Sequence, residues 1–395
     1  MIAHILIKAF AKINLWLGLL FRSDKPRYSF SDIRSVMVKR TDRIGDAVIT
    51  LPLLLELKKH FQVTVLTSSY NDYFLKEFIK TRVFTDRPLD FLGCIKLMFS
   101  NLFLMFKRQK KGIPQYDLCL DLNGIRELNV LAKIKEENLC KYYASFNMGI
   151  WNSLLQYSYP RYPVLFSDKH ILNTYRILVK EATGVEVKPP DYIDFSEKMA
   201  KPFDFNITES FILINISGIE KFRGPSPKMY AELINSLDVK GKILIMDELN
   251  RPHLQEFKEH NKRSDVLYLD KDLSIWELLY IAAKSLLYVG SDSGISHLLQ
   301  MPTNAVLFFA SPIPCVWKPY SQKPYNKSKI GNLLVEETVT SRGLRKKVIY
   351  RPIWCRPCFD IGCLAKSCIY DMDIKVLASE INSTIKNIAY VNHSV

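Results

Sequence analysis

The 395-residue chain lacks GxGxxG and GxxxxGK[ST], the two glycine-rich signatures of dinucleotide-binding and P-loop folds. It also lacks a zinc-finger spacing and an aromatic RNA-binding motif, which places nucleic acid last among the expected partners. Acidic residues are scarce, 40 against 55 lysines and arginines, so the net charge is +15. Such an excess predicts an anionic partner, either an acidic lipid surface or a phosphorylated substrate, unless it only solvates the surface.

The first 21 residues are mostly apolar, yet no small-residue cleavage site follows them, which argues against a secretory signal. His4, Lys8 and Lys12 fall on one helical stripe, and two lysines inside the stretch argue against a spanning helix. Two interpretations stay open. The segment is an interfacial amphipathic helix with a cationic face, or a helix docked on the protein's own surface.

The length predicts two domains, and 48% apolar with 24% charged residues is a globular composition. Strand-like apolar runs alternate with helical segments in two series, over residues 31–190 and 191–375, with Pro189-Pro190 as the candidate linker. This alternation predicts an α/β protein with two doubly wound parallel sheets. Residues 1–30 are expected to form an N-terminal extension and residues 376–395 a C-terminal helix.

Two short turns, far apart in the sequence, each follow a strand-like run and precede a helical one. They are Arg-Ile-Gly-Asp at residues 43–46 and Ser-Asp-Ser-Gly-Ile-Ser-His at residues 291–297. Turns of this kind lie at the carboxyl edge of a parallel sheet, where α/β proteins bind ligands. Asp46 is the only acid of the first turn and could deprotonate an attacking hydroxyl, although helix capping is the commoner role.

The second turn predicts a phosphate site. Asp292 stands where an N-cap belongs. The amide groups of Ser293, Gly294 and Ile295 would then point out of the helix start, as anion sites require. His297 lies on the same helical face as Ser293, so its imidazole can reach the same anion, unless its role is only structural.

A further anion-handling segment follows the strand-like run 211–214. Ser217 supplies a hydroxyl there, and Lys221 or Arg223 supplies a cation that could neutralise a diphosphate leaving group. Glu248, after the next strand, is a candidate for hydrogen-bonding a nucleoside or sugar hydroxyl.

Four of the eight cysteines cluster near the C-terminus, at Cys355, Cys358, Cys363 and Cys368. Thiols this close could hold zinc or an iron–sulfur cluster, or they are reduced structural cysteines. We predict no cofactor and no metal, with this cluster as the open alternative.

In combination, these segments resemble the heptosyltransferases, glycosyltransferase family nine, which build the inner core of bacterial lipopolysaccharide. The resemblance rests on the first turn with Pro52, on Asp-Leu-x-x-Asp-Leu at 117–122, on His170, and on Val-Gly-Ser-Asp-Ser-Gly-x-x-His at 289–297. It covers roughly residues 34–380.

The resemblance implies a GT-B fold, two Rossmann-like domains facing across a cleft, with the acceptor bound by 31–190 and the nucleotide-sugar by 191–375. It implies inverting, metal-independent heptose transfer from ADP-heptose to a lipopolysaccharide-type or lipid-linked acceptor. A cytoplasmic protein held peripherally on the inner membrane is expected. Asp46 would be the general base. The residues implied for donor binding are Ser217, Lys221 or Arg223, Asp292, Ser293, Gly294 and His297.

Residues 223–227, Arg-Gly-Pro-Ser-Pro, depart from the family's basic-x-Trp-Pro pattern, which leaves the donor open. One alternative is a GT-B transferase that uses another sugar nucleotide in capsule or O-antigen synthesis. Another is a catalytically silent, membrane-associated binding protein with the same fold. A third is a metalloprotein built on the cysteine cluster.

Overall fold

The computed structural model describes residues 26, 28–84, 113–123, 128–146, 155, 157–159, 169–202, 205–217, 224–247, 253–309, 314–353 and 367–392. The chain divides between Pro189 and Pro190 into two compact units. Several predicted features lie outside the described residues: the N-terminal helix, Lys221, Arg223, Glu248, Cys355, Cys358 and Cys363.

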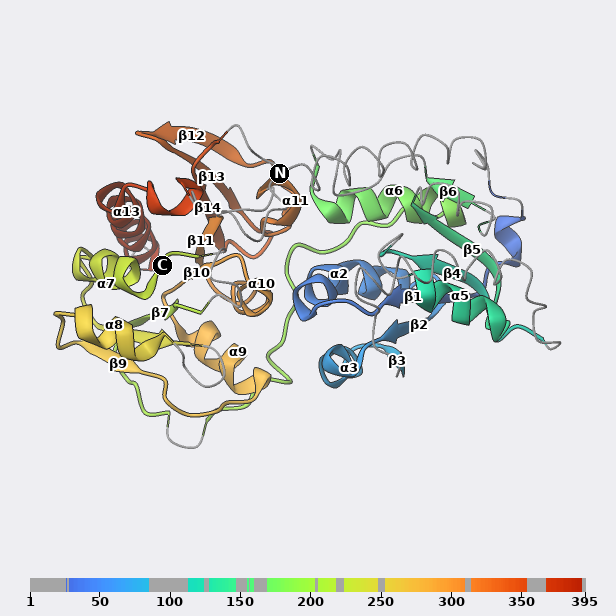
Figure 1. The fold of residues 1–395 in the computed structure, drawn as a ribbon, viewed down its shortest axis with the longest axis horizontal. Helices are drawn as coiled ribbons and strands as arrows, with labels where there is room; N and C mark the ends of the chain where they lie inside the picture. The colour runs from blue at the N-terminus through green and yellow to red at the C-terminus, as the bar shows by residue number, and fades with distance from the viewer. Residues whose placement is uncertain are drawn as a thin grey trace, which may run out of the picture. The chain divides into compact units, whose positions relative to one another are not determined.

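The first unit is built on a six-stranded parallel sheet with strand order β3-β2-β1-β4-β5-β6 (Figure 1). Its strands are β1 (Ser35–Arg40), β2 (Gln62–Thr67), β3 (Lys80–Val83), β4 (Tyr116–Asp121), β5 (Cys140–Phe146) and β6 (Tyr157–Tyr159). Its helices are η2 (Phe30–Asp32), α2 (Ile44–Leu57), α3 (Ser69–Leu75), α5 (Leu128–Glu136) and α6 (Ile171–Thr183). The chain moves to the other side of β1 when it enters β4, which makes the gap between these strands the switch point of a doubly wound sheet.

Helices cover both faces of this sheet, so its central strands read as continuous apolar runs. On one face, Met37 and Cys119 share a buried cluster with Val130 and Ile134 of α5. On the other face, α2 packs against α6. Helix α2 continues through Pro52.

The second unit carries an eight-stranded sheet with order β12-β13-β14-β11-β10-β7-β8-β9. Its strands are β7 (Phe211–Asn215), β8 (Lys242–Met246), β9 (Val266–Tyr268), β10 (Leu287–Ser291), β11 (Ala305–Phe309), β12 (Asn326–Ile330), β13 (Leu333–Val339) and β14 (Arg345–Tyr350). Six of these strands are mutually parallel, and their order, β9-β8-β7-β10-β11-β14, matches that of the first sheet. Strands β13 and β12 extend the sheet beyond β14, and each is antiparallel to the strand before it. The switch point here lies between β7 and β10.

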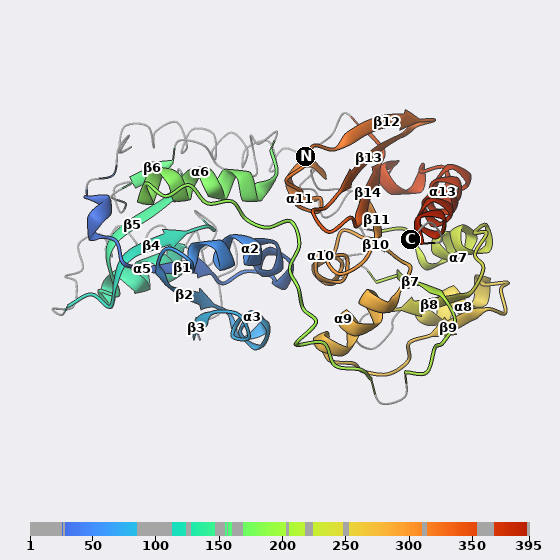
Figure 2. The ribbon, with the colours of Figure 1, turned by 180° about the vertical axis from the view of Figure 1, so that it is seen from behind.

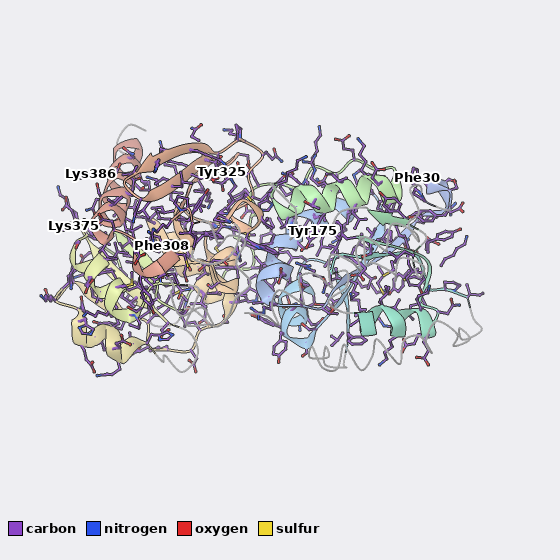
Figure 3. All side chains as sticks on the ribbon, turned by 45° about the horizontal axis from the view of Figure 1, so that its top comes forward. Phe30, Tyr175, Phe308, Tyr325, Lys375 and Lys386 are labelled. Atoms are coloured by element: carbon purple, nitrogen blue, oxygen red, sulfur yellow. The ribbon has the colours of Figure 1, made fainter. Side chains whose placement is uncertain are left out.

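The helices of the second unit also cover both faces of its sheet (Figures 1 and 2). They are α7 (Pro227–Asn235), α8 (Leu254–His260), α9 (Ile275–Lys284), α10 (Gly294–Leu299), α11 (Pro314–Trp317), α12 (Ser367–Tyr370) and α13 (Ile374–Asn392). One buried cluster joins α7, α8 and α13 to the sheet, and Phe308 of β11 belongs to it (Figure 3). Helices α9 and α10 contact each other on the opposite face.

Local sequence signals set several helix ends. Ser226 caps α7 by accepting from the Met229 amide at 3.2 Å, and Pro227 follows at the first helical position. Ser274 and Glu277 form a reciprocal capping box on α9. Gly184 ends α6 with φ of 74°, a conformation that favours glycine.

The two doubly wound parallel sheets predicted from the sequence are confirmed. Strands β3, β5, β6, β9 and β12 to β14 were not predicted. Among the described helices, none is both long enough and apolar enough to span a membrane.

Candidate active site

Buried polar groups gather at the switch point of the second unit's sheet. Strand β7 ends at Asn215 and is followed by Ser217, while the neighbouring β10 ends at Ser291 and is followed by Asp292. These four residues come from segments about 75 positions apart and are all buried. The sheet therefore brings together the two segments, around Ser217 and 291–297, that the sequence singled out separately.

Asn215 and the two serines are tied to each other. The Asn215 Oδ1 accepts from the Ser217 amide at 2.9 Å and from the Ser217 hydroxyl at 2.5 Å. The Ser291 hydroxyl donates to the Ser217 carbonyl at 3.3 Å. These bonds hold the loop after β7 against the end of β10, so the Ser217 hydroxyl has a defined position. Sequence reasoning missed Asn215, although an asparagine that ends the apolar run of β7 was the available signal.

Asp292 does not cap the following helix. Ser293 is the N-cap of α10, and its hydroxyl accepts from the Ser296 amide at 3.3 Å. The Asp292 carboxylate lies instead 3.0 Å from His297 Nε2, and the two side chains are only 4% and 8% exposed. The prediction of Asp292 as the N-cap was wrong, because its carboxylate contacts the His297 imidazole, about one helical turn further on, and the Ser293 hydroxyl caps the helix start. Asp292 therefore fixes the orientation of the His297 ring beside this turn.

Two glycines, Gly224 and Gly290, allow close packing around the turn at residues 291–297. The Tyr288 hydroxyl lies 2.8 Å from the Ser296 hydroxyl, which is in turn 2.9 Å from the Ser293 hydroxyl. A Cβ atom at Gly290 would come within 2.8 Å of the first hydroxyl and 2.9 Å of the second. A Cβ at Gly224 would meet the Ser291 hydroxyl at 2.9 Å.

Replacing Gly290 by alanine is expected to lower the free energy of unfolding by about 1–3 kcal/mol, because the added methyl overfills a packed region. It should also separate the hydroxyls of Tyr288 and Ser296. Urea unfolding followed by circular dichroism measures this loss. An unfolding midpoint equal to that of the wild type would contradict the packing described here.

In the first unit, Asp46 lies in the first turn of α2, after the N-cap residue Arg43. Its carboxylate oxygen Oδ1 is 3.1 Å from Arg40 Nη2, and its side chain is 17% exposed. Its backbone carbonyl accepts from the Thr50 hydroxyl at 2.7 Å and from Arg40 Nε at 3.2 Å. Asp46 thus sits at the carboxyl edge of its sheet, as predicted, partly open to solvent and beside a cation that the sequence did not reveal.

Three further motif residues have structural roles. Asp117 Oδ2 accepts from the amides of Arg34 and Ser35 at 2.9 and 2.8 Å, so it ties the start of β1 to β4. Asp121 Oδ1 lies 2.9 Å from the buried Lys39 Nζ at the opposite end of the same strand pair. His170 caps α6 by accepting from the Leu172 amide at 3.1 Å.

The described part of the chain contains no group of three histidine, cysteine or carboxylate residues arranged to hold a metal ion. Of the clustered cysteines, only Cys368 is described, and its side chain is buried. The alternative of a metal held by that cluster therefore stays a prediction.

Neither a protein-family model nor a curated protein matches this sequence. Solved structures do. The E. coli ADP-heptose lipopolysaccharide heptosyltransferase II matches with a TM-score of 0.53 at 14% identity, over 90% of this chain and 99% of that one. This chain has the heptosyltransferase fold.

Two other structures support the heptosyltransferase fold. The E. coli heptosyltransferase WaaC with ADP matches with a TM-score of 0.51 at 17% identity, over 71% of this chain and 89% of that one. The glycosyltransferase family 9 structure from Veillonella parvula matches with a TM-score of 0.53 at 14% identity, over 73% and 83% of the two chains. The predicted GT-B fold, an α/β architecture with two Rossmann-like sheets, is thereby confirmed. At these identities the likeness establishes the fold alone.

Proposed function

We propose that this protein is an inverting glycosyltransferase that moves a heptose from ADP-heptose to a hydroxyl of a lipopolysaccharide-type or lipid-linked glycan. One observation carries the proposal. Two distant segments, 215–217 and 291–293, meet at the switch point of the second sheet, where the Ser291 hydroxyl donates to the Ser217 carbonyl. In a doubly wound fold this is where a nucleotide binds. A protein of the same fold, WaaC, was solved with ADP.

In the proposed reaction, Asp46 accepts the proton of the acceptor hydroxyl as that oxygen attacks the anomeric carbon. The new C–O bond forms on the face opposite the bond to the diphosphate, which breaks and leaves its electron pair on the phosphate oxygen. The products are the glycoside with inverted configuration and ADP. The proton then passes from Asp46 to solvent.

Charge that develops on the leaving diphosphate needs preorganised donors. We assign this role to the hydroxyls of Ser217 and Ser293 and to the Gly294 amide, with Lys221 or Arg223 as the neutralising cation. The Asp292 carboxylate is suited to accept hydrogen bonds from sugar hydroxyls while it orients His297. Glu248 is our candidate for a nucleoside hydroxyl. We propose that these groups act without a metal ion.

The partners follow from the same proposal. The donor is a nucleotide-sugar, and the acceptor is an anionic, lipid-linked glycan, which suits the net charge of +15. We propose that the protein works at the cytoplasmic face of the inner membrane, with residues 1–30 as the associating segment.

Thermal unfolding with a panel of ADP, UDP, GDP and CMP tests the donor site. We expect ADP alone to stabilise the wild type, by about 2.7 kcal/mol at a concentration 100 times its dissociation constant. The double variant Asp292→Ala, His297→Ala should lose this shift. The control is Arg263→Ala, Asp265→Ala, which removes a 2.7 Å ion pair at the amino end of β9, away from the switch point, and should keep it.

The other outcomes separate the alternatives. Stabilisation by UDP or GDP instead of ADP would keep the site but replace the donor, as expected of a capsule or O-antigen transferase. Loss of the ADP shift in the control as well would show that the double variant acts through stability. No stabilisation by any nucleotide would contradict the proposed transferase and favour the silent binding protein.

A further inference from the structure

Arg40 ends β1 in the first unit, and its side chain is only 2% exposed. A guanidinium cannot be buried at tolerable free energy without partners, because it keeps its charge under all physiological conditions. Its partners therefore show what the surrounding structure is arranged to hold. They come from the turn after β1, from α2, from the segment after β4 and from α6.

Two carboxylates face this one guanidinium. Nη2 lies 3.1 Å from Asp46 Oδ1, and Nη1 lies 3.3 Å from Asp42 Oδ2. The Nε–H group donates to the Asp46 carbonyl at 3.2 Å, so Arg40 holds both the side chain and the backbone of Asp46. The planar fork of arginine is what allows both contacts at once.

The guanidinium is itself fixed on its other side. Nη1 donates to Asn123 Oδ1 at 3.0 Å, and the Asn123 amide donates to Asp121 Oδ1 at 2.9 Å. The Tyr175 ring of α6 (Figure 3) lies 5.5 Å from the guanidinium carbon, within range of a cation–π contact. Burial raises the pKa of Tyr175, so this ring remains a neutral phenol.

The consequence for Asp46 is an asymmetric carboxylate. Oδ1 is paired with Arg40, whereas Oδ2 has no hydrogen-bond or ionic partner within the described part of the chain. A general base needs one oxygen directed at the reacting hydroxyl and a carboxylate that does not rotate away from it. The contacts of Arg40 meet both needs.

We propose that Arg40 is a positioning residue for this reaction: through Oδ1 and the backbone carbonyl it orients Asp46, so that Oδ2 meets the acceptor hydroxyl. This inference rests on the proposed function, since it concerns the base of that reaction. Arg40 acts on the catalytic step and leaves donor binding, which uses the second unit, unchanged.

The test compares Arg40→Lys and Arg40→Met with the wild type in an assay of ADP release. The probes are ADP-heptose and lipopolysaccharide from a strain that adds no heptose. We expect Arg40→Met to lower kcat about 100-fold, and Arg40→Lys, which keeps the charge but not the fork, about tenfold. KM for ADP-heptose should stay at the wild-type value in both variants.

A double-mutant cycle distinguishes positioning from a merely structural role. If Arg40 acts through Asp46, adding Arg40→Met to Asp46→Asn lowers the residual kcat no further. The matched control is Arg176→Met. Arg176, in the same unit, is half-buried and donates to the Val187 carbonyl at 2.8 Å, so its loss should affect stability but not kcat.

Each result decides one of the two proposals. Full activity in Arg40→Lys, a change confined to KM, or additive losses in the cycle would overturn the role of Arg40 while leaving the transferase intact. Should Arg40→Met fail to fold, Arg40→Lys and the cycle built on it carry the test. An inactive wild type with these probes, together with no stabilisation by ADP, would instead count against the proposed function.

Discussion

Replacing Asp46 by asparagine should reduce kcat for heptose transfer by about a thousandfold while leaving ADP binding unchanged. Asparagine keeps the shape of the side chain but cannot accept the acceptor's proton. The proposed donor contacts belong to the second unit, so thermal stabilisation by ADP should persist. Initial rates of ADP release at saturating ADP-heptose measure the loss.

Asp117→Asn is the control for this variant. Asp117 lies in the same sheet, but it accepts hydrogen bonds from the amides of Arg34 and Ser35 at the start of β1. Asp46 follows the opposite end of that strand. We expect Asp117→Asn to reduce stability and to retain kcat. Retention of more than a tenth of the wild-type kcat in Asp46→Asn would argue against a general base at this position.

The second large effect concerns stability and arises from Lys346 of β14. Its ammonium group is fully enclosed and donates to the carbonyls of Gln300, Met301 and Thr303, the last at 2.5 Å. These carbonyls follow the C-terminal end of α10, where a cation is favourable. Burial nevertheless lowers the pKa of Lys346 to about 7, against the opposing influence of Asp191.

The sign of the pH effect follows from this lowered pKa. The folded protein releases the Lys346 proton near pH 7, whereas an unfolded chain keeps it until about pH 10. Between these values the unfolded state binds more protons, so the free energy of unfolding rises with pH. From pH 7 to pH 9, the expected gain from this residue is about 2 kcal/mol.

Urea unfolding of the wild type and of Lys346→Met, at pH 7 and pH 9, measures this gain as the difference between the two proteins. Other groups titrate in both and cancel from that difference. Lys347→Met is a matched control, because Lys347 pairs with Glu380 at 2.8 Å in place of backbone carbonyls. Equal pH dependence in the wild type and Lys346→Met would show that Lys346 stays charged when buried.

Much of the fold was predictable because parallel strands covered on both faces appear as short apolar runs. Val36 to Val38 and Phe211 to Ile214 are such runs, and both became central strands. Strand β12 was missed for the opposite reason. It is an exposed edge strand with alternating lysines, a pattern that protects a sheet edge from pairing but carries no apolar signal.

The candidate site was predictable in its turns and less so in its pairings. Asp46, Ser217 and Asp292 each follow a strand, so their positions at a sheet edge could be inferred from order alone. The cap of α10 could not, since Asp292 and Ser293 are both good capping residues. Contact with His297 decided between them.

The sequence by itself determined two doubly wound sheets and the turns that carry Asp46 and Asp292, because local periodicity and turn chemistry are properties of neighbouring residues. Only the tertiary structure decided which groups meet. Arg40 reaches Asn123, 83 positions away, because β1 and β4 pair at the switch point of their sheet. Contacts across adjacent strands depend on strand order, which no local pattern specifies, and the surroundings of Asp46 depend on that order.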